Sequence, residues 1–260
     1  MRKLRLVFGY FLGIAGLSKS DIILASFPKA GNTWLKFIFS NYILLHDIKP
    51  KVLTFELSNN LVPELGVNNL LKPWRISALP RFVKTHRAFH KLFQKPTKVL
   101  LLLRNPRSLM VSYYQYAQAS HNLHYSGSFS EFIRHPKMGL TGFVSHTNSW
   151  MARKATILWY EDLLSNTQLV CEQTFKSLHL TVDKQKLKES IALSTIEAMQ
   201  AIEAMNPAVH ANRLSADYKF VRDGKRLKWQ DLASAEDELF LDNLCNQLHP
   251  EVLSALKSRK

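Results

Sequence analysis

The chain has 260 residues, of which 46% are hydrophobic and 11% aromatic, so it is long enough to bury a full core, and wholesale disorder is excluded. Its two cysteines, Cys171 and Cys245, exclude a disulfide framework and a thiolate metal site, which favours a reducing compartment. The net charge of +15 attracts polyanions, such as nucleic acid, an anionic membrane or a phosphate-rich ligand, without choosing among them.

The first element in chain order is a basic and apolar segment over residues 1–20. It begins Met-Arg-Lys-Leu-Arg and continues as an apolar run over residues 6–17. This run is shorter than the roughly 20 residues that span a bilayer. We therefore predict a helix that packs on the domain. A cleaved signal peptide and a helix that touches a membrane surface are the alternatives.

Short apolar runs alternate with helical patterns through the rest of the chain. Runs bounded by turn or charged residues predict buried parallel strands at 21–27, 82–84, 99–103 and 156–159. Apolar residues at helical spacing predict helices over 33–45, 106–119, 161–178, 184–193 and 235–248. This alternation predicts one α/β domain over residues 21–260, with a central parallel sheet flanked by helices and an irregular insertion at 63–80.

A tight corner follows the first strand, with the sequence Ser-Phe-Pro-Lys-Ala-Gly-Asn-Thr-Trp over residues 26–34. Ligands of parallel sheets bind beyond the carboxyl ends of the strands, near helix N-termini. Gly31 lets the backbone approach a ligand, Thr33 adds a hydroxyl and Lys29 adds a positive charge, so we expect an anion site. The lysine precedes the glycine, so the Walker A pattern for ATP is not met. A plain turn with a surface lysine is the alternative.

Two other strand ends carry polar groups. The strand at 99–103 delivers Arg104, and the following helix presents Ser112 about two turns in, so a guanidinium and a hydroxyl can converge on one phosphate. The strand at 82–84 ends in Lys84-Thr-His86, and histidine is the natural general base near neutral pH. Each signal alone also fits a structural role, for Arg104 at the sheet edge and for His86 on the surface.

Together these stretches resemble the motifs of the PAPS-dependent sulfotransferases, a cytosolic type with many bacterial members. Six ordered stretches between about residue 21 and residue 230 carry the resemblance: a 5′-phosphosulfate loop at 27–34, the segment of a catalytic histidine at 84–86, a 3′-phosphate motif at 104–112, adenine-contacting segments at 160–162 and 194–199, and a closing segment at 222–229.

The resemblance implies a P-loop-like fold and transfer of a sulfuryl group from PAPS to a hydroxyl or amine, with release of PAP and no metal. It implies His86 as general base, with Lys29 and Lys84 as cations at the transferred group. The residues that it implies for PAPS binding are Lys29, Ala30, Gly31, Asn32, Thr33, Trp34, Arg104, Ser112, Tyr160, Ser194, Ile196, Arg222, Asp223 and Gly224.

The chain departs from the family pattern at three places. Asn32 replaces a threonine, and its amide is expected to donate in the same way. Ile196 stands where an aromatic ring often stacks on adenine, which leaves more of that stacking to Trp34. The closing segment has Asp223 in place of a lysine and Leu227 in place of its second glycine.

Two other functions fit parts of the sequence. An ATP-dependent nucleotide or small-molecule kinase shares the architecture but needs the Walker A arrangement. A non-enzymatic basic module for nucleic acid or another polyanion fits the charge but leaves the placement of His86 and Arg104 unexplained.

The sequence says less about partners. We expect a cytoplasmic protein with no nucleic-acid partner, and its N-terminus is a candidate for peripheral membrane contact. The acceptor is expected to be a small-molecule or lipid-like hydroxyl compound, and the basic surface and apolar N-terminus hint at an anionic or membrane-proximal one. No motif indicates an oligomeric state.

Overall fold

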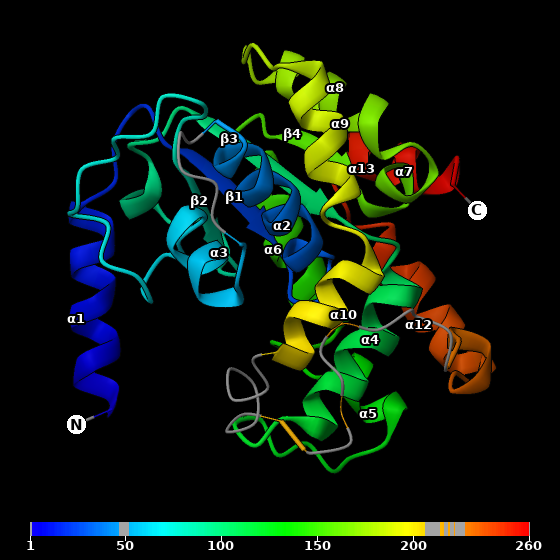
Figure 1. Cartoon of the computed structure of the whole chain (residues 1–260). Helices are drawn as coiled ribbons and strands as arrows, with labels where there is room; N and C mark the ends of the chain where they lie inside the picture. Colours follow the sequence, from blue (N-terminus) through cyan, green and yellow to red (C-terminus); the bar gives the residue numbers. More distant parts are fainter. Residues whose placement is uncertain are drawn as a thin grey trace.

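Figure 1 shows the computed structural model, which describes residues 2–46, 52–205, 214–215, 218, 221 and 227–259. Within these residues, one parallel sheet has the strand order β2-β1-β3-β4. Its strands are β1 (Ile22–Ser26), β2 (Phe82–Thr85), β3 (Lys98–Leu103) and β4 (Thr156–Trp159). β1 pairs with β2 on one side and with β3 on the other, through Ile22↔Phe82 and Ile22↔Lys98. The predicted α/β fold with a central parallel sheet is confirmed.

The central strands are fully buried. Each residue from Ile22 to Ala25 in β1 and from Leu100 to Leu102 in β3 is 0% exposed. Strands with apolar side chains on both faces need helices on both faces, as in other all-parallel sheets. Full burial of each leucine or isoleucine stabilises the fold by about 1.5–3 kcal/mol, so the carboxyl ends of these strands are held firmly in place.

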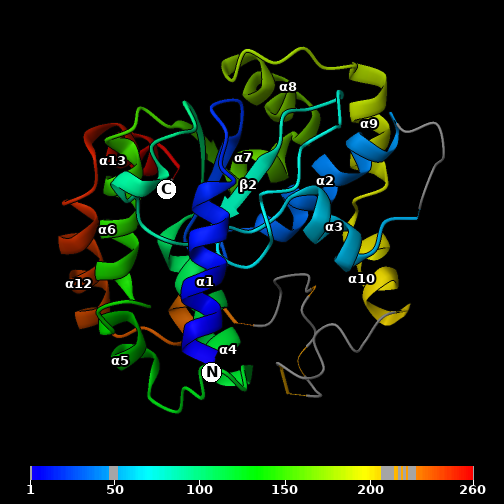
Figure 2. The ribbon, with the colours of Figure 1, turned by 90° about the vertical axis from the view of Figure 1, so that its left-hand side faces the viewer.

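Helices cover both faces of the sheet (Figure 2). On one face lies α2 (Asn32–Leu44), which packs against α3 (Phe55–Leu61) and α9 (Lys184–Ala192). On the other face lies α6 (Leu140–Met151), which packs against α4 (Pro106–Ala119) and α12 (Ala235–Cys245). The remaining described helices are α1 (Arg2–Ala15), α5 (Phe129–Arg134), α7 (Tyr160–Ser165), α8 (Thr167–Ser177), α10 (Ile196–Met205), α13 (Pro250–Lys257), and the 3-10 turns η1 (Lys91–Phe93) and η2 (Trp229–Asp231).

One predicted helix is wrong. The helix expected over 161–178 is two helices, α7 and α8, because the backbone breaks at Asn166 with φ −155° and ψ 81°. The side chain of Asn166 then caps α8 by accepting a hydrogen bond from the Leu169 N–H at 3.1 Å. Asparagine is among the preferred N-cap residues, so its preference ends one helix and begins the next.

α1 runs into β1 at the margin of the domain (Figure 1). Its C-terminal end touches the insertion at 63–80 so closely that a β-carbon at Gly16 would lie 2.3 Å from the carbonyl carbon of Leu70. The insertion contains no helix or strand, as predicted, although Glu64 forms an isolated bridge with Lys84 of β2. None of the described helices combines the length and the hydrophobicity that a membrane crossing requires.

Candidate functional site

The corner between β1 and α2 is built from an unusual backbone. Lys29 has φ 69° and Gly31 has φ 107°, and both values lie in the left-handed region. Gly31 is the N-cap of α2 and makes no side-chain cap. The first N–H groups of α2 therefore lack a side-chain acceptor, and they lie at the positive end of the helix dipole. Such a helix start suits an anion.

Tyr160 lies directly on this corner. A β-carbon at Gly31 would lie 2.4 Å from Cδ2 of the Tyr160 ring, so only glycine fits between the ring and the corner. The same ring meets Trp34 edge-on, with 6.0 Å between the ring centroids. The two residues expected to contact adenine, from α2 and from the end of β4, therefore lie side by side.

Arg104 ties β3 to the corner. Its Nη1 donates a hydrogen bond to the Lys29 carbonyl at 3.2 Å, and its guanidinium lies 4.7 Å from the centroid of the Tyr160 ring. Its Nε donates to Ser108 Oγ at 3.1 Å. Ser112 lies one helical turn after Ser108 on α4, so both hydroxyls share one face of that helix. Ser108 was not among the predicted site residues, although its spacing of four residues from Arg104 was the available signal.

The ammonium of Lys29 lies over an aromatic ring. Its Nζ is 4.7 Å from the centroid of Tyr116, which comes from α4. A cation over an aromatic face is attracted by the ring quadrupole. The contact holds the positive charge between the corner and α4, close to the carbonyl that binds Arg104.

His86 follows β2 and faces the end of β1. Its Nδ1 lies 2.9 Å from the carbonyl oxygen of Ser26. A carbonyl oxygen only accepts, so Nδ1 carries the proton and Nε2 keeps the lone pair that accepts a proton. The geometry therefore selects one tautomer of the imidazole.

The side chain of Asn32 lies on the inner side of the corner. Its amide Nδ2 donates to the hydroxyl of Ser26, and Asn32 is only 6% exposed. The same hydroxyl lies 3.4 Å from His86 Nδ1. Because Ser26 offers an acceptor next to the corner, the side-chain amide is turned inward and supports His86, rather than pointing outward to a phosphate.

The imidazole of His86 is held neutral. Burial, followed by the positive charge of Lys84, lowers the pKa of His86 to about 3, although Glu64 and the Ser26 carbonyl oppose the shift. Desolvation disfavours the charged form of a histidine. At neutral pH, His86 is therefore in the form that a general base requires.

Lys84 lies two residues before His86 and points to the same face of the sheet. Its Nζ forms an ion pair with Glu64 Oε2 at 2.8 Å, and the two side chains are 13% and 33% exposed. Glu64 was missed from the sequence because it lies in the irregular insertion, where no motif marks it.

The residues expected in the adenine-contacting and closing segments differ in their surroundings. Ser194 is 0% exposed; its hydroxyl donates to the Ser190 carbonyl at 2.7 Å and accepts from Asn41 Nδ2 at 3.0 Å. The hydroxyl of Ser194 is thus bonded between α9 and α2, and the expected contact of Ser194 with a ligand stays a prediction. Ile196 is 37% exposed at the start of α10. The expected ligands Arg222, Asp223 and Gly224 lie outside the described residues.

The corner, the guanidinium of Arg104 and the imidazole of His86 thus meet at the carboxyl ends of β1, β3 and β2. A family model described as a sulfotransferase domain matches residues 19–254. The chain belongs to the sulfotransferase family.

Known sulfotransferases are similar over much of the chain. Sulfotransferase 6B1 of Pan troglodytes is 27% identical over 192 residues, which cover 70% of this chain and 62% of that relative. Sulfotransferase 4A1 of Mus musculus is 26% identical over 66% of this chain and 64% of its own length. The matches thus span less than two thirds of these two relatives. Sulfotransferase 1B1 of Canis lupus familiaris is 25% identical over 85% of this chain and 80% of its own length.

Solved structures show the same fold. The mouse sulfotransferase SULT7A1, complexed with PAP, superposes with a TM-score of 0.69 at 20% identity, over 96% of this chain and 92% of that one. Retinol dehydratase, in complex with androsterone and the inactive cofactor PAP, superposes with a TM-score of 0.67 at 17% identity, over 94% and 84%. The sulfotransferase fold predicted from the sequence, a P-loop-like α/β fold, is confirmed.

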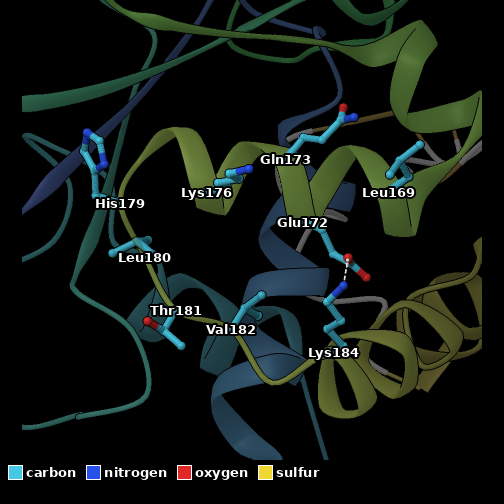
Figure 3. A pocket seen from close by; sticks show the side chains of 9 residues that line it. All are labelled: Leu169, Glu172, Gln173, Lys176, His179, Leu180, Thr181, Val182 and Lys184. Carbon is cyan, nitrogen blue, oxygen red and sulfur yellow. Dashed lines mark ion pairs between the residues drawn. The ribbon is translucent and has the colours of Figure 1, made fainter.

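A surface hollow of the sulfotransferase lies apart from this site. It has a volume of about 450 Å³ and lies over α8 and the loop that leads to α9 (Figure 3). Glu172 and Lys184 form an ion pair of 2.9 Å in its wall, and the lysine side chain is 73% exposed. None of its lining residues comes from the corner or from the strand ends, so it does not belong to the candidate site.

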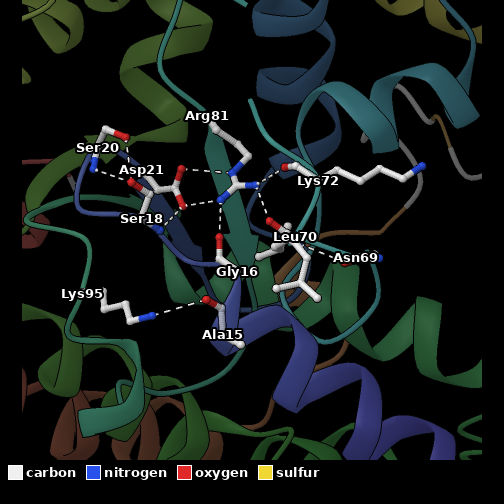
Figure 4. A network of polar contacts seen from close by, with 11 residues as sticks. Ala15, Gly16, Ser18, Ser20, Asp21, Asn69, Leu70, Lys72, Arg81 and Lys95 are labelled. Atoms are coloured by element: carbon white, nitrogen blue, oxygen red, sulfur yellow. Dashed lines mark hydrogen bonds and ion pairs between the residues drawn. The ribbon is translucent and has the colours of Figure 1, made fainter. Parts of the chain in front are cut away.

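The sulfotransferase also has a buried polar network at the amino ends of β1 and β2 (Figure 4). Arg81 donates from Nε and Nη2 to the two carboxylate oxygens of Asp21 at 3.0 and 2.7 Å. It also donates to the carbonyls of Gly16 at 2.6 Å and Leu70 at 2.8 Å. Arg81 and Asp21 are 6% and 2% exposed, and every bond joins parts of the fold, so this network is structural.

Proposed function

We propose that this sulfotransferase transfers the sulfuryl group of PAPS to a hydroxyl or amine of a small acceptor and releases PAP. The observation that carries the proposal is the neutral His86, held with its Nε2 unprotonated at the sheet edge that also carries the anion corner. Two solved relatives of the same fold bind PAP, and retinol dehydratase also binds androsterone or retinol, which supports a small-molecule acceptor.

The described residues fit a sulfated nucleotide. The uncapped start of α2 and the side chain of Lys29 suit the 5′-phosphate, and the missing β-carbon of Gly31 leaves room at the turn. Arg104 suits the 3′-phosphate, because a guanidinium binds phosphate with charge-assisted hydrogen bonds. The rings of Trp34 and Tyr160 suit the adenine.

The protein groups then have separate tasks. PAPS, when bound, supplies the sulfuryl group and a phosphate as leaving group. His86 Nε2 takes the proton of the acceptor while the acceptor oxygen or nitrogen bonds to sulfur. Lys29 stabilises the charge that gathers on the bridging oxygen as its bond to sulfur breaks, and Lys84 acts at the sulfuryl oxygens. A loose, in-line transfer of this kind needs positioning and charge neutralisation above all.

We further propose a cytoplasmic location. The two cysteines are buried and free, which fits a reducing compartment.

The test compares His86→Ala with His90→Ala, a matched control at an exposed histidine beside η1. We expect His86→Ala to lower the rate of PAPS-dependent transfer by about a hundred-fold to ten-thousand-fold, the usual effect of a general base. Affinity for PAP, measured by calorimetry, should change little in both variants. Loss of PAP binding in His86→Ala, in parallel with the loss of transfer, would instead make the residue structural.

A further inference from the structure

A group of charged and polar residues lies next to His86, and Lys84 is its one member with a task proposed above, at the sulfuryl oxygens. It consists of Lys36 from α2, Asn59 from α3, Glu64 from the insertion and Lys84 from β2, and we call it the acceptor-side cluster. Arg104 directly follows β3 and Tyr160 directly follows β4, on the other side of β1. The cluster therefore lies on the β2 side of the corner, where the acceptor of His86 must enter.

The backbone fixes the carboxylate of the cluster. The Lys84 N–H donates to the Pro63 carbonyl at 2.8 Å, and the Leu65 N–H donates to the Lys84 carbonyl at 2.9 Å. Residue 64 is thereby held beside β2 like a residue of an edge strand. The Glu64 carboxylate pairs with Lys84 and also interacts electrostatically with His86, so it belongs to the immediate surroundings of the base.

Lys36 is the unusual member of the acceptor-side cluster. It is 8% exposed, and its ammonium donates one hydrogen bond among the described residues, to Asn59 Oδ1. An ammonium has three donors, and a buried one that is not paired is costly. Burial and then repulsion by Lys84 lower the pKa of Lys36 to about 7, although Glu64 opposes the shift.

Lys84 and Glu64 balance each other, and Lys36, with a pKa of about 7, carries its proton in about half of the molecules at pH 7, so the cluster has a partial positive charge. Lys36 and Lys84 face one carboxylate, and His86 adds no charge because it is neutral. An anionic ligand would add a second negative charge beside Glu64 and neutralise the cluster, whereas a cationic ligand would add a third positive charge to it. An apolar ligand would leave Lys36 with unused donors in a dry site. Asn59 is exposed and the side chain of Glu64 is 33% exposed, so the cluster borders the solvent.

We propose that the acceptor-side cluster binds an acidic group of the acceptor, so that the preferred acceptor is a hydroxyl compound that also carries a carboxylate or a similar anion. This inference rests on the sulfuryl transfer proposed above. Lys36 is the residue that selects the acid, through an ammonium–anion hydrogen bond. The carboxylate of Glu64 holds Lys84 in position. Its negative charge also disfavours binding of the acidic group of the acceptor directly beside His86.

The test uses three phenols of similar size: 3-(4-hydroxyphenyl)propionate, 4-ethylphenol and tyramine, which are anionic, neutral and cationic. PAPS-dependent transfer to each is measured with the wild type, Lys36→Met and Lys36→Arg. Lys176→Met, an exposed lysine of α8, is the control for the same change in net charge. Binding of PAP is measured for all four proteins.

We expect the wild type to prefer the propionate over 4-ethylphenol by about ten-fold to a hundred-fold in kcat/KM, the usual worth of a hydrogen bond to a charged group. Lys36→Met should remove this preference while transfer to 4-ethylphenol and binding of PAP stay nearly unchanged. Lys36→Arg should keep much of it, and Lys176→Met all of it. A purely structural role of Lys36 would instead lower transfer to the three phenols equally.

The inference is overturned if the neutral or the cationic phenol is preferred, if Lys36→Met keeps the preference, or if the propionate is not accepted by a protein that binds PAP. If Lys36→Met does not fold, the ranking of the three phenols by the wild type still decides. Absence of PAP binding in the wild type would contradict the proposed sulfuryl transfer itself, which separates the two failures.

Discussion

Gly31 shows how one residue serves both the fold and the site. Its φ of 107° is strained for any other residue, and its missing β-carbon makes room for the ring of Tyr160. The same backbone turn aims the start of α2 at the place expected for a phosphate. Packing against Tyr160 and the expected binding of a phosphate thus both depend on Gly31.

We therefore expect Gly31→Ala to lower the free energy of unfolding by about 1 kcal/mol or more, because alanine disfavours a positive φ and its β-carbon meets the Tyr160 ring. PAP binding should weaken at the same time. Urea unfolding and calorimetry check both effects. The double variant Gly31→Ala/Tyr160→Ala removes the clash and should recover part of the stability; no recovery would mean that the ring is not the obstacle.

At this scale, the sequence predicted residues that stand directly at strand ends. The position of Lys29, His86 and Arg104 at one edge could be predicted because a parallel sheet brings the carboxyl ends of its strands together there. Ser26 and Glu64 were missed because their roles depend on neighbours that only the folded chain supplies. The hydrogen bonds of Ser194 to Ser190 and Asn41 were hidden for the same reason.

At the scale of elements, the network around Arg81 joins four segments. Arg81 precedes β2, Asp21 precedes β1, Gly16 directly follows α1, and Leu70 belongs to the insertion. The buried guanidinium thus connects the amino edge of the sheet with the N-terminal helix. We expect its loss to loosen α1 as well as the sheet.

Arg81→Ala should lower the free energy of unfolding by about 3–5 kcal/mol, because it leaves the carboxylate of Asp21 buried without its partner. Urea denaturation measures the change. Arg81→Met/Asp21→Asn, which removes both charges, should cost clearly less. Equal losses in the single and double variants would show that the ion pair itself is not what matters.

Helices were predicted where apolar spacing was regular, and α6 was missed because packing there overrides local preference. α6 carries glycine, threonine, valine and asparagine, which are weak helix formers, yet it is helical because Phe143 and Trp150 are buried against the sheet and its neighbours. For α7 and α8 a local preference decided the structure. The preference of Asn166 for an N-cap position divides the region in two, although its apolar pattern predicted one helix.

At the scale of the whole molecule, two histidines make stability depend on pH. His146 is 3% exposed, and burial, followed by repulsion from His86 where that ring is protonated, lowers the pKa of His146 to about 3. The native state keeps His146 neutral, while the unfolded chain takes up a proton below about pH 6.5. Protons therefore favour the unfolded state as the pH falls from about 6.5 toward 3, and His86 acts in the same direction.

We expect the wild type to become less stable between pH 6.5 and 5, with His146 contributing up to about 1.4 kcal/mol per pH unit. His146→Met, which cannot take up a proton, should flatten the dependence by that amount. Urea unfolding at pH 7, 6 and 5 compares the two proteins. Identical slopes would show that His146 is already able to protonate in the native state.

The positive charge of the whole molecule attracts anions of every kind, so only a selective response identifies the nucleotide. The most direct measurement is calorimetric titration of PAP and of ADP, which lacks the 3′-phosphate, into the wild type, Arg104→Ala and the exposed control Arg75→Ala. We predict that the wild type and Arg75→Ala bind PAP at least about ten-fold more tightly than ADP. Arg104→Ala should bind PAP and ADP about equally, with an affinity for ADP close to that of the wild type. Equal affinity of the wild type for PAP and ADP, or an equal loss of both in Arg104→Ala, would contradict this prediction.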